Sequence, residues 1–238
     1  MNKCYVLIGN FGSGKSEISI NISMQAAKKE KAVLVDLDIV NPYFRSVERK
    51  GELEAAGVKL YHPIFALTTV DVPSLPPDIY SVFVGDYDTV VFDVGGDPAG
   101  ATALGQYRAN FAKLPEGVLE VLYVINPNRP LSSSPEQVLE MLEKIQYRSR
   151  LPVSGFINNA NLAGETSADD LLLGYDMLKI ISEKTGIPVS YTCGTKTVLE
   201  NFAKIAKERE LNDRYIGEYK EIQIYMHRDW DRFTTLGV

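Results

Sequence analysis

Short apolar runs alternate with amphipathic stretches along most of the chain. The runs are rich in β-branched residues, and they cover residues 4–9, 32–38, 89–95, 118–125, 152–158 and 188–192. Continuous apolar runs of this length are typical of parallel strands that are covered on both faces. Helical patterns fill most of the intervals, at residues 15–30, 43–56, 99–113, 135–148, 168–185 and 196–209. This alternation predicts an α/β fold: a doubly wound, mostly parallel sheet with helices on both faces.

Some of the predicted helices carry residues that favour a first or last turn. Asn41-Pro42 and Ser134-Pro135 each place an N-cap residue before a proline at the first helical position. Gly186 stands where a helix needs a residue in the left-handed conformation at its end. These signals predict helix starts near residues 42 and 135 and a helix end near residue 186.

Two stretches depart from the alternation of strands and helices. Residues 64–77 are rich in proline, and we expect a surface excursion there before a short helix near residues 78–84. In residues 213–238 the apolar positions alternate around Ile222 and Ile224, which predicts an edge strand or a docking tail. We therefore expect one domain over residues 1–212 and a C-terminal tail, residues 213–238, packed on it.

The composition excludes several classes of partner and location. The net charge is −6, so no overall positive field attracts nucleic acid or anionic lipid, and neither is an expected partner. No run approaches the roughly 18 apolar residues of a membrane-spanning helix. The N-terminal apolar run breaks at Gly9, too early for a secretory signal. Cys4 and Cys193 are far apart, which disfavours a disulfide framework or a cysteine-held cluster. We expect a cytoplasmic protein.

The residues between the first predicted strand and the first predicted helix match a phosphate-binding loop. Their sequence, GNFGSGKS at residues 9–16, has the form GxxxxGK[ST]. Glycines let successive backbone N–H groups turn inward around an anion, and the helix that follows directs its positive end at the phosphates. Lys15 supplies charge to the β- and γ-phosphates, and the Ser16 hydroxyl is a hard ligand for Mg²⁺. A chance match in a glycine-rich turn is the alternative, which the strand before the loop and the helix after it disfavour.

We therefore assign the nucleotide contacts to this loop, the P-loop, and to the start of the next helix. The predicted contact residues are Gly9, Asn10, Gly12, Ser13, Gly14, Lys15, Ser16 and Glu17.

Three acidic residues follow or end predicted strands. Asp93 precedes two glycines in the run TVVFDVGG, which is the pattern of a carboxylate that orients water on Mg²⁺, with Gly96 near the γ-phosphate. Asp36 and Asp38 are two residues apart on a strand and so point to the same side. We predict Ser16, Asp36, Asp38 and Asp93 as the metal site. The alternative is that the three carboxylates are ordinary strand ends and that Asp38 caps the next helix. Arg45, in that helix, could reach a phosphate or form a surface ion pair.

Together these motifs resemble the MinD/ParA-type branch of P-loop NTPases, a group that also includes dethiobiotin synthetase. The resemblance covers about residues 3–194 and implies ATP and Mg²⁺ as ligands. It implies that Lys15 and Asp38 are the catalytic residues, with Asp38 polarising the attacking water. Asp36 and Asp93 would support Mg²⁺ through its waters.

The resemblance also implies how the base is recognised. Relatives end the strand at GFINN with an asparagine that reads the edge of adenine, and Asn159 or its neighbour Asn158 stands there. An amide donates and accepts at once, which suits adenine, and the chain has no NKxD motif for guanine. Residues 192–194 would form a loop over the base. A capping or turn role is the alternative for the asparagine pair.

Three functions follow from these features. The first is a slow regulatory or assembly ATPase that a protein partner stimulates. The second is an ATP-dependent ligase or kinase that resembles dethiobiotin synthetase and uses a small-molecule acceptor. The third is a non-catalytic nucleotide sensor. A homodimer is one expected assembly, but Asn10 replaces the lysine that partition-type relatives extend to the partner's nucleotide. This replacement favours the second function somewhat, and we rank the first function ahead of it.

Overall fold

The computed structural model describes residues 1–38, 46–62 and 77–226. In these segments, eight strands form one sheet in the order β3-β2-β4-β1-β5-β6-β7-β8, and all of their pairings are parallel. The strands are β1 (Lys3–Ile8), β2 (Ala32–Leu37), β3 (Lys59–Tyr61), β4 (Thr89–Val94), β5 (Leu119–Ile125), β6 (Gly155–Asn158), β7 (Val189–Gly194) and β8 (Glu218–Glu221).

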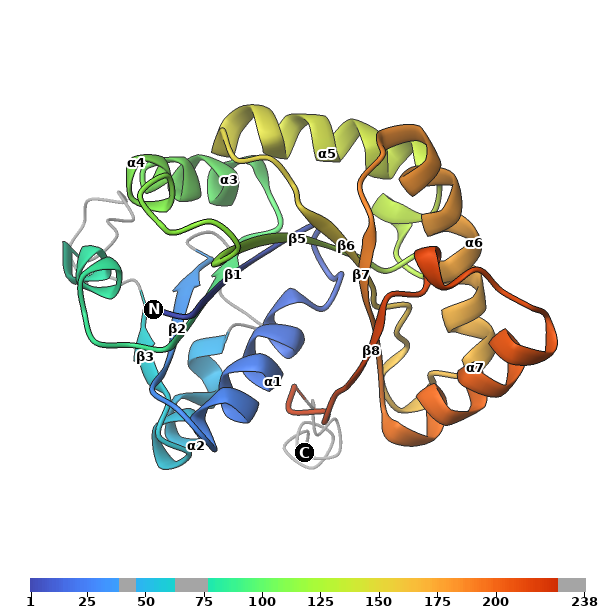
Figure 1. Ribbon diagram of the computed structural model, residues 1–238, viewed down its shortest axis with the longest axis horizontal. Coiled ribbons are helices and arrows are strands. Elements are labelled where there is room, and N and C mark those ends of the chain that lie inside the picture. The colour runs from blue at the N-terminus through green and yellow to red at the C-terminus, as the bar shows by residue number, and fades with distance from the viewer. Residues whose placement is uncertain (39–45, 63–76, 227–238) are drawn as a thin grey trace, which may run out of the picture.

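Helices cover both faces of this sheet, as the sequence predicts. The α-helices are α1 (Lys15–Ala27), α2 (Lys50–Ala55), α3 (Pro98–Gly105), α4 (Arg108–Phe111), α5 (Pro135–Ser149), α6 (Ala168–Thr185) and α7 (Lys196–Glu208). Figure 1 shows α1 and α2 below the sheet and α3, α4 and α5 above it. The doubly wound α/β fold is therefore confirmed.

Two apolar cores lie on opposite faces of the sheet. Along β1, Val6 and Ile8 point into the core beneath α3 to α7, whereas Leu7 points into the core beneath α1. All three side chains are buried. This burial on both faces explains why the strands read as continuous apolar runs instead of alternating ones.

Two helix boundaries agree with the sequence signals. The Ser134 hydroxyl accepts a hydrogen bond from the Gln137 amide at 3.4 Å, and Pro135 begins α5. Gly186 ends α6 with φ of 76°. Asn41 and Pro42, the other predicted helix start, lie outside the described residues, as does Arg45.

Other elements differ from the prediction. The helix expected over residues 99–113 is divided into α3 and α4. Gly105, the last residue of α3, packs closely against α5, since a Cβ there would lie 2.9 Å from the Arg148 carbonyl oxygen. The three-residue strand β3 is too short to show in the apolar pattern. The helix expected near 78–84 is a 3-10 helix at Pro77–Phe83, and a 3-10 turn at Ser46–Arg49 leads into α2. Residues 64–76 of the predicted excursion lie outside the described residues.

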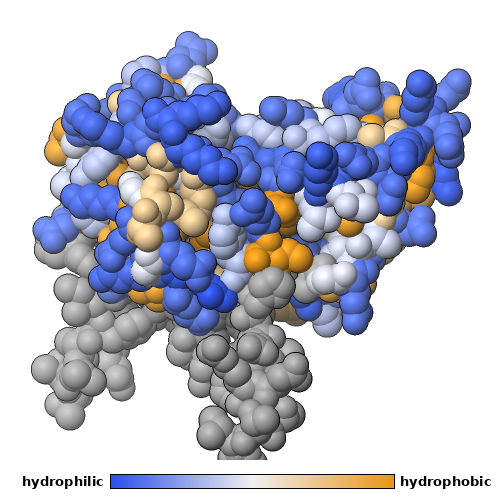
Figure 2. All heavy atoms as spheres, turned by 90° about the horizontal axis from the view of Figure 1, so that it is seen from below, coloured by the Kyte–Doolittle hydropathy of each residue, from blue (hydrophilic) through white to orange (hydrophobic). Residues whose placement is uncertain are grey.

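The described part of the C-terminal segment belongs to the same sheet and then follows α1. β8 forms the sheet edge beside β7, and Ile222 is buried in the core beneath α1. Figure 2 views the α1 and α2 side, where hydrophilic side chains cover most of the surface and apolar atoms form small groups. No helix in the described part of the chain is long and apolar enough to cross a membrane.

Candidate nucleotide-binding site

The P-loop follows the central strand at the point where the strand order reverses. β1 lies between β4 and β5, so the chain winds outward from it in both directions. Ligands of open parallel sheets bind at such a switch point, outside the carboxyl ends of the strands. Residues 9–14 leave β1 there and lead directly into α1.

The start of α1 has backbone donors that no side chain caps. Its N-cap residue is Gly14, with φ of 92°, and among the described residues no side-chain hydrogen bond closes the first turn. The free N–H groups at a helix start and the helix dipole together favour an anion. A Cβ at Gly14 would lie 2.2 Å from the Asn159 amide nitrogen, so only glycine fits at this position.

Lys15 is buried beside the carboxylates of the site. Its ammonium donates to the Asn10 carbonyl oxygen at 3.1 Å. Burial lowers the Lys15 pKa below its usual range, while the charges of Asp93, Asp38 and Asp97 act in the opposite direction. A cation held in this way is ready to exchange a backbone carbonyl for a phosphate oxygen.

The turn after β4 approaches the P-loop closely. A Cβ at Gly96 would lie 2.6 Å from the Phe11 amide nitrogen and 2.9 Å from the Lys15 ammonium. Only glycine allows this close approach of residue 96 to the P-loop backbone and to Lys15.

Asp93 is the buried centre of the predicted metal site. Its carboxylate accepts hydrogen bonds from the Ser46 and Ser16 hydroxyls. Burial raises the Asp93 pKa above its usual range, although both serines and Lys15 oppose the rise. Ser46 was not recognised in the sequence, since only the fold brings it to a strand that is 47 residues away.

Asp36 lies near the end of β2, and Asp38 directly follows that strand, both beside Asp93. Asp36 in β2 stands opposite Asp93 in β4 in the strand register. The Asp36 carboxylate accepts hydrogen bonds from the backbone amides of Asp38 at 3.0 Å and Val47 at 3.3 Å. Asp38 is half-buried, and its Oδ1 would lie 3.1 Å from a Cβ at Gly95. The structure therefore brings all three predicted carboxylates to one edge, with Ser16 beside them.

The donors at this edge suit a Mg²⁺ ion. No three His, Cys, Asp or Glu side chains in the described segments converge as a complete metal cage. Mg²⁺ needs no such cage, because it keeps waters and takes one or two protein oxygens together with substrate phosphates. The Ser16 hydroxyl and the buried Asp93 carboxylate are hard oxygen donors of that kind, so these residues fit the ion.

Asn158 and Asn159 form hydrogen bonds to backbone carbonyl groups within the protein. The Asn159 amide donates to the Ser13 carbonyl oxygen at 2.8 Å, and the Asn158 amide donates to the Leu171 carbonyl oxygen at 2.9 Å. Both residues are fully buried. In this arrangement Asn159 supports the P-loop from beneath. Residues 192–194, expected in a loop over the base, instead end β7.

Two further predicted contact residues also have partners within the chain. The Asn10 amide donates to the Leu131 carbonyl oxygen at 2.6 Å. The Glu17 carboxylate accepts from the backbone amides of Tyr225 at 2.6 Å and Met226 at 3.0 Å. Glu17 thus holds the C-terminal segment, a role that sequence reasoning missed because the partners are about 200 residues away.

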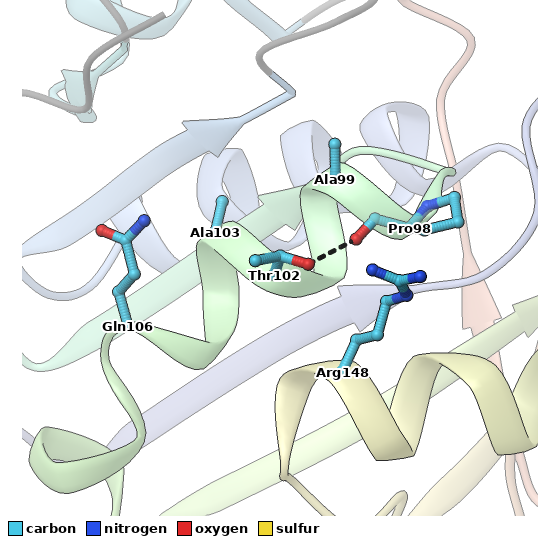
Figure 3. Close-up of a pocket in the computed structure, with 6 residues that line it drawn as sticks. All are labelled: Pro98, Ala99, Thr102, Ala103, Gln106 and Arg148. Carbon is cyan, nitrogen blue, oxygen red and sulfur yellow. Dashed lines mark hydrogen bonds between the residues drawn. The ribbon is translucent and has the colours of Figure 1, made fainter.

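A hollow elsewhere on the surface does not involve these residues. It lies between α3 and α5 and is lined by Pro98, Ala99, Thr102, Ala103, Gln106 and Arg148 (Figure 3). Apart from Arg148 its lining is uncharged, and it includes none of the predicted site residues. We therefore place the candidate site at the P-loop and not at this hollow.

No family model and no curated protein matches the chain. Solved structures do match. The cell division protein FtsY of Thermotoga maritima is 17% identical with a TM-score of 0.53, over 81% of this chain and 61% of that one. The signal recognition particle 54 kDa protein of Aeropyrum pernix, in complex with GDP, is 16% identical with a TM-score of 0.55, over 87% and 46% of the two chains. This chain has a P-loop NTPase fold.

The comparisons correct the family expected from the sequence. The solved structures described above are FtsY and signal recognition particle proteins, so the assignment to the MinD/ParA-type ATPases is wrong. The reason is physical: a P-loop between strand and helix and acidic strand ends serve the same phosphate chemistry in many P-loop proteins. These motifs identify the loop, but they do not identify the branch.

Proposed function

We propose that this chain binds a nucleoside triphosphate with Mg²⁺ at the P-loop and hydrolyses it slowly. One observation carries the proposal: the uncapped start of α1 and the buried Lys15 ammonium face the buried Asp93, which is hydrogen-bonded to Ser16. This combination of anion donors and hard oxygen ligands at a switch point suits a polyphosphate and its metal.

Each residue has a distinct task in this proposal. The amides of residues 9–14 and Lys15 hold the phosphates. Ser16 would bind Mg²⁺, and Asp93 and Asp36 would hold its waters. When bound, the ion would neutralise negative charge on the phosphate oxygens. Asp38 orients the attacking water.

The reaction is phosphoryl transfer to water. The bond between the water oxygen and the γ-phosphorus forms while the bond from that phosphorus to its bridging oxygen breaks. Asp38 accepts the proton of the water and passes it to solvent. The products are a nucleoside diphosphate and inorganic phosphate.

The identity of the nucleotide base is a separate question from phosphate binding. The sequence argument for adenine rests on the asparagine pair, whose amides are buried in hydrogen bonds to backbone carbonyls. The signal recognition particle structure of similar fold contains GDP. The proposal therefore depends on the phosphates alone, and ATP and GTP are to be titrated in parallel.

We propose a protein partner that stimulates hydrolysis, in preference to a small-molecule acceptor. The hollow between α3 and α5 includes no P-loop residue, and apart from Gln106 and Arg148 its lining side chains are small. This hollow therefore offers no acceptor site beside the P-loop. Slow turnover by the purified chain is the expected basal behaviour.

The test is the binding of Mg²⁺–ATP and Mg²⁺–GTP, measured by calorimetry, to the parent, Lys15→Ala and Lys28→Ala. Losing a charged hydrogen bond costs about 1.5–3 kcal/mol, or about 10- to 100-fold in affinity. We expect this loss only for Lys15→Ala, because Lys28 is exposed at the other end of α1. Equal binding by Lys15→Ala and the parent would overturn the proposal.

A further inference from the structure

A second loop lies against the P-loop. This β5 loop, residues 126–132, follows β5 and is held firmly: Asn126 donates to the Asn161 carbonyl oxygen at 2.9 Å, and Ser132 donates to the Asn126 carbonyl oxygen at 2.6 Å. The Arg129 amide closes a turn onto Asn126 at 3.2 Å. The backbone from which the Arg129 side chain extends is therefore preorganised.

The β5 loop touches the P-loop at two points. The Asn10 amide donates to the Leu131 carbonyl oxygen at 2.6 Å, and the Arg129 Nε donates to the Gly12 carbonyl oxygen at 3.1 Å. The Arg129 side chain also covers Gly12, since a Cβ there would lie 3.6 Å from Arg129 Cδ and Nε. A guanidinium thus lies against the middle of the phosphate-binding loop.

The charge of Arg129 is not neutralised by this contact. A guanidinium has five N–H donors, and the Gly12 carbonyl takes one of them. In the described segments, no carboxylate forms an ion pair with Arg129. The residue is exposed. An exposed cation with free donors beside an anion-binding loop has the chemistry of a phosphate ligand.

We propose that Arg129 contacts the terminal phosphoryl group of the bound triphosphate and neutralises charge on it during transfer. The inference rests on the proposed function and names a further catalytic residue for it. The planar guanidinium can bind two oxygens of one phosphoryl group, and such an arginine acts mainly in the transition state. The arginine is supplied by the same chain, from the β5 loop.

The experiment compares two states of the ligand. Calorimetry measures the affinity of Mg²⁺–ADP and Mg²⁺–GDP, each with and without tetrafluoroaluminate, a mimic of the transferring phosphoryl group. The variants are Arg129→Ala, Arg129→Lys and, as a matched control, Arg108→Ala, which removes an exposed arginine from α4. Steady-state release of phosphate is measured in parallel.

In the parent, tetrafluoroaluminate should raise the affinity for the diphosphate. We expect this increase to be at least about 100-fold smaller in Arg129→Ala, and turnover to fall by a similar factor. Affinity for the diphosphate alone should change less than about 3-fold. Arg129→Lys should recover only part of the loss, because lysine lacks the planar fork. Arg108→Ala should match the parent.

Three results would overturn the inference. An equal loss with and without tetrafluoroaluminate would mean that Arg129 only supports the P-loop through Gly12. No loss in either state would mean that it does not reach the phosphoryl group. If the parent binds neither diphosphate nor triphosphate, the proposed function itself fails, and this inference fails with it.

Discussion

Asn159 shows how one side chain supports the phosphate loop. It is buried beneath the P-loop, where its amide donates to the Ser13 carbonyl oxygen and its nitrogen approaches Gly14. A buried carbonyl that loses its donor costs free energy. The same residue was expected to read adenine, and these two roles have different consequences when the amide is removed.

Asn159→Ala should lower the free energy of unfolding by about 1–3 kcal/mol, because the Ser13 carbonyl oxygen would remain buried without that donor. It should weaken ATP and GTP binding by the same factor, since the damage is to the phosphate loop. Urea denaturation and parallel titrations check this. A loss confined to ATP would show instead that Asn159 reads the base.

Asp93 is a carboxylate that the unliganded fold accommodates at a cost. Burial raises its pKa above the usual 3.8, so ionised Asp93 destabilises the folded state relative to the unfolded one. The favourable contribution of the protonated form is complete below pH 3.8 and is lost as the pH rises through the raised pKa. If the site needs ionised Asp93 to hold a metal, the folded protein is less stable when no ligand is bound.

Asp93→Asn should raise the free energy of unfolding without ligand by about 0.5–2 kcal/mol at pH 7, because it resembles the protonated form. The difference from the parent should shrink toward pH 3.8. Mg²⁺-dependent nucleotide binding should fall in the same variant. Asp176→Asn, at an exposed position of α6, serves as the control. A less stable Asp93→Asn at pH 7 would contradict the assigned cost.

Among the helices, α1 contacts three parts of the protein. It begins at the phosphate site, its apolar side packs on the sheet, and a row of its polar residues contacts the C-terminal segment. Glu17, Asn21 and Gln25 recur every four residues and so form one stripe along it. Each contacts the backbone of the segment 221–226, and the Asn21 side chain bonds the Gln223 amide at 2.7 Å and its carbonyl oxygen at 2.8 Å.

Asn21→Ala should release the end of this segment. We expect a loss of about 1–3 kcal/mol in unfolding free energy, because two backbone groups of Gln223 lose their partner. Hydrogen exchange at the Gln223, Tyr225 and Met226 amides should become faster. Gln25→Ala removes one exposed hydrogen bond and should have a much smaller effect. Unchanged exchange in Asn21→Ala would contradict the role of the stripe.

At the scale of the whole molecule, the sheet places the phosphate loop on its central strand, and in the described part of the chain β3 and β8 are its edge strands. β8 presents Glu218, Lys220 and Glu221 along its four residues. Charged side chains on a short edge strand oppose pairing with a second copy. The exposed large apolar side chains of the described residues are spread over several elements. These features favour a single chain when no nucleotide is bound.

Analytical ultracentrifugation should therefore give a mass near 26.4 kDa without nucleotide. The same measurement with a non-hydrolysable triphosphate and Mg²⁺ tests the homodimer expected from the sequence. A stable dimer without any nucleotide would contradict the argument from the charged edge.

Much of the fold was predictable because its signals are local. The apolar runs, the proline at the start of α5 and Gly186 depend on neighbours a few residues away. The contact of Gly105 with α5, at the end of α3, was not predictable, because it depends on the packing of two helices that are far apart in the sequence. The branch of P-loop proteins was also predicted wrongly, since its motifs are common to the phosphate chemistry.

Part of the candidate site was also predictable from the sequence, and part was not. The loop at residues 9–16 and the acidic strand ends could be read from the chain, because a phosphate requires particular residues at fixed local spacing. The partners of these residues could not. Asn159 reaches Ser13 across 146 positions, and Arg129 reaches Gly12 across 117. The order of the parallel strands brings such residues together at one edge, and that order arises from packing of the complete sheet, which no local pattern encodes.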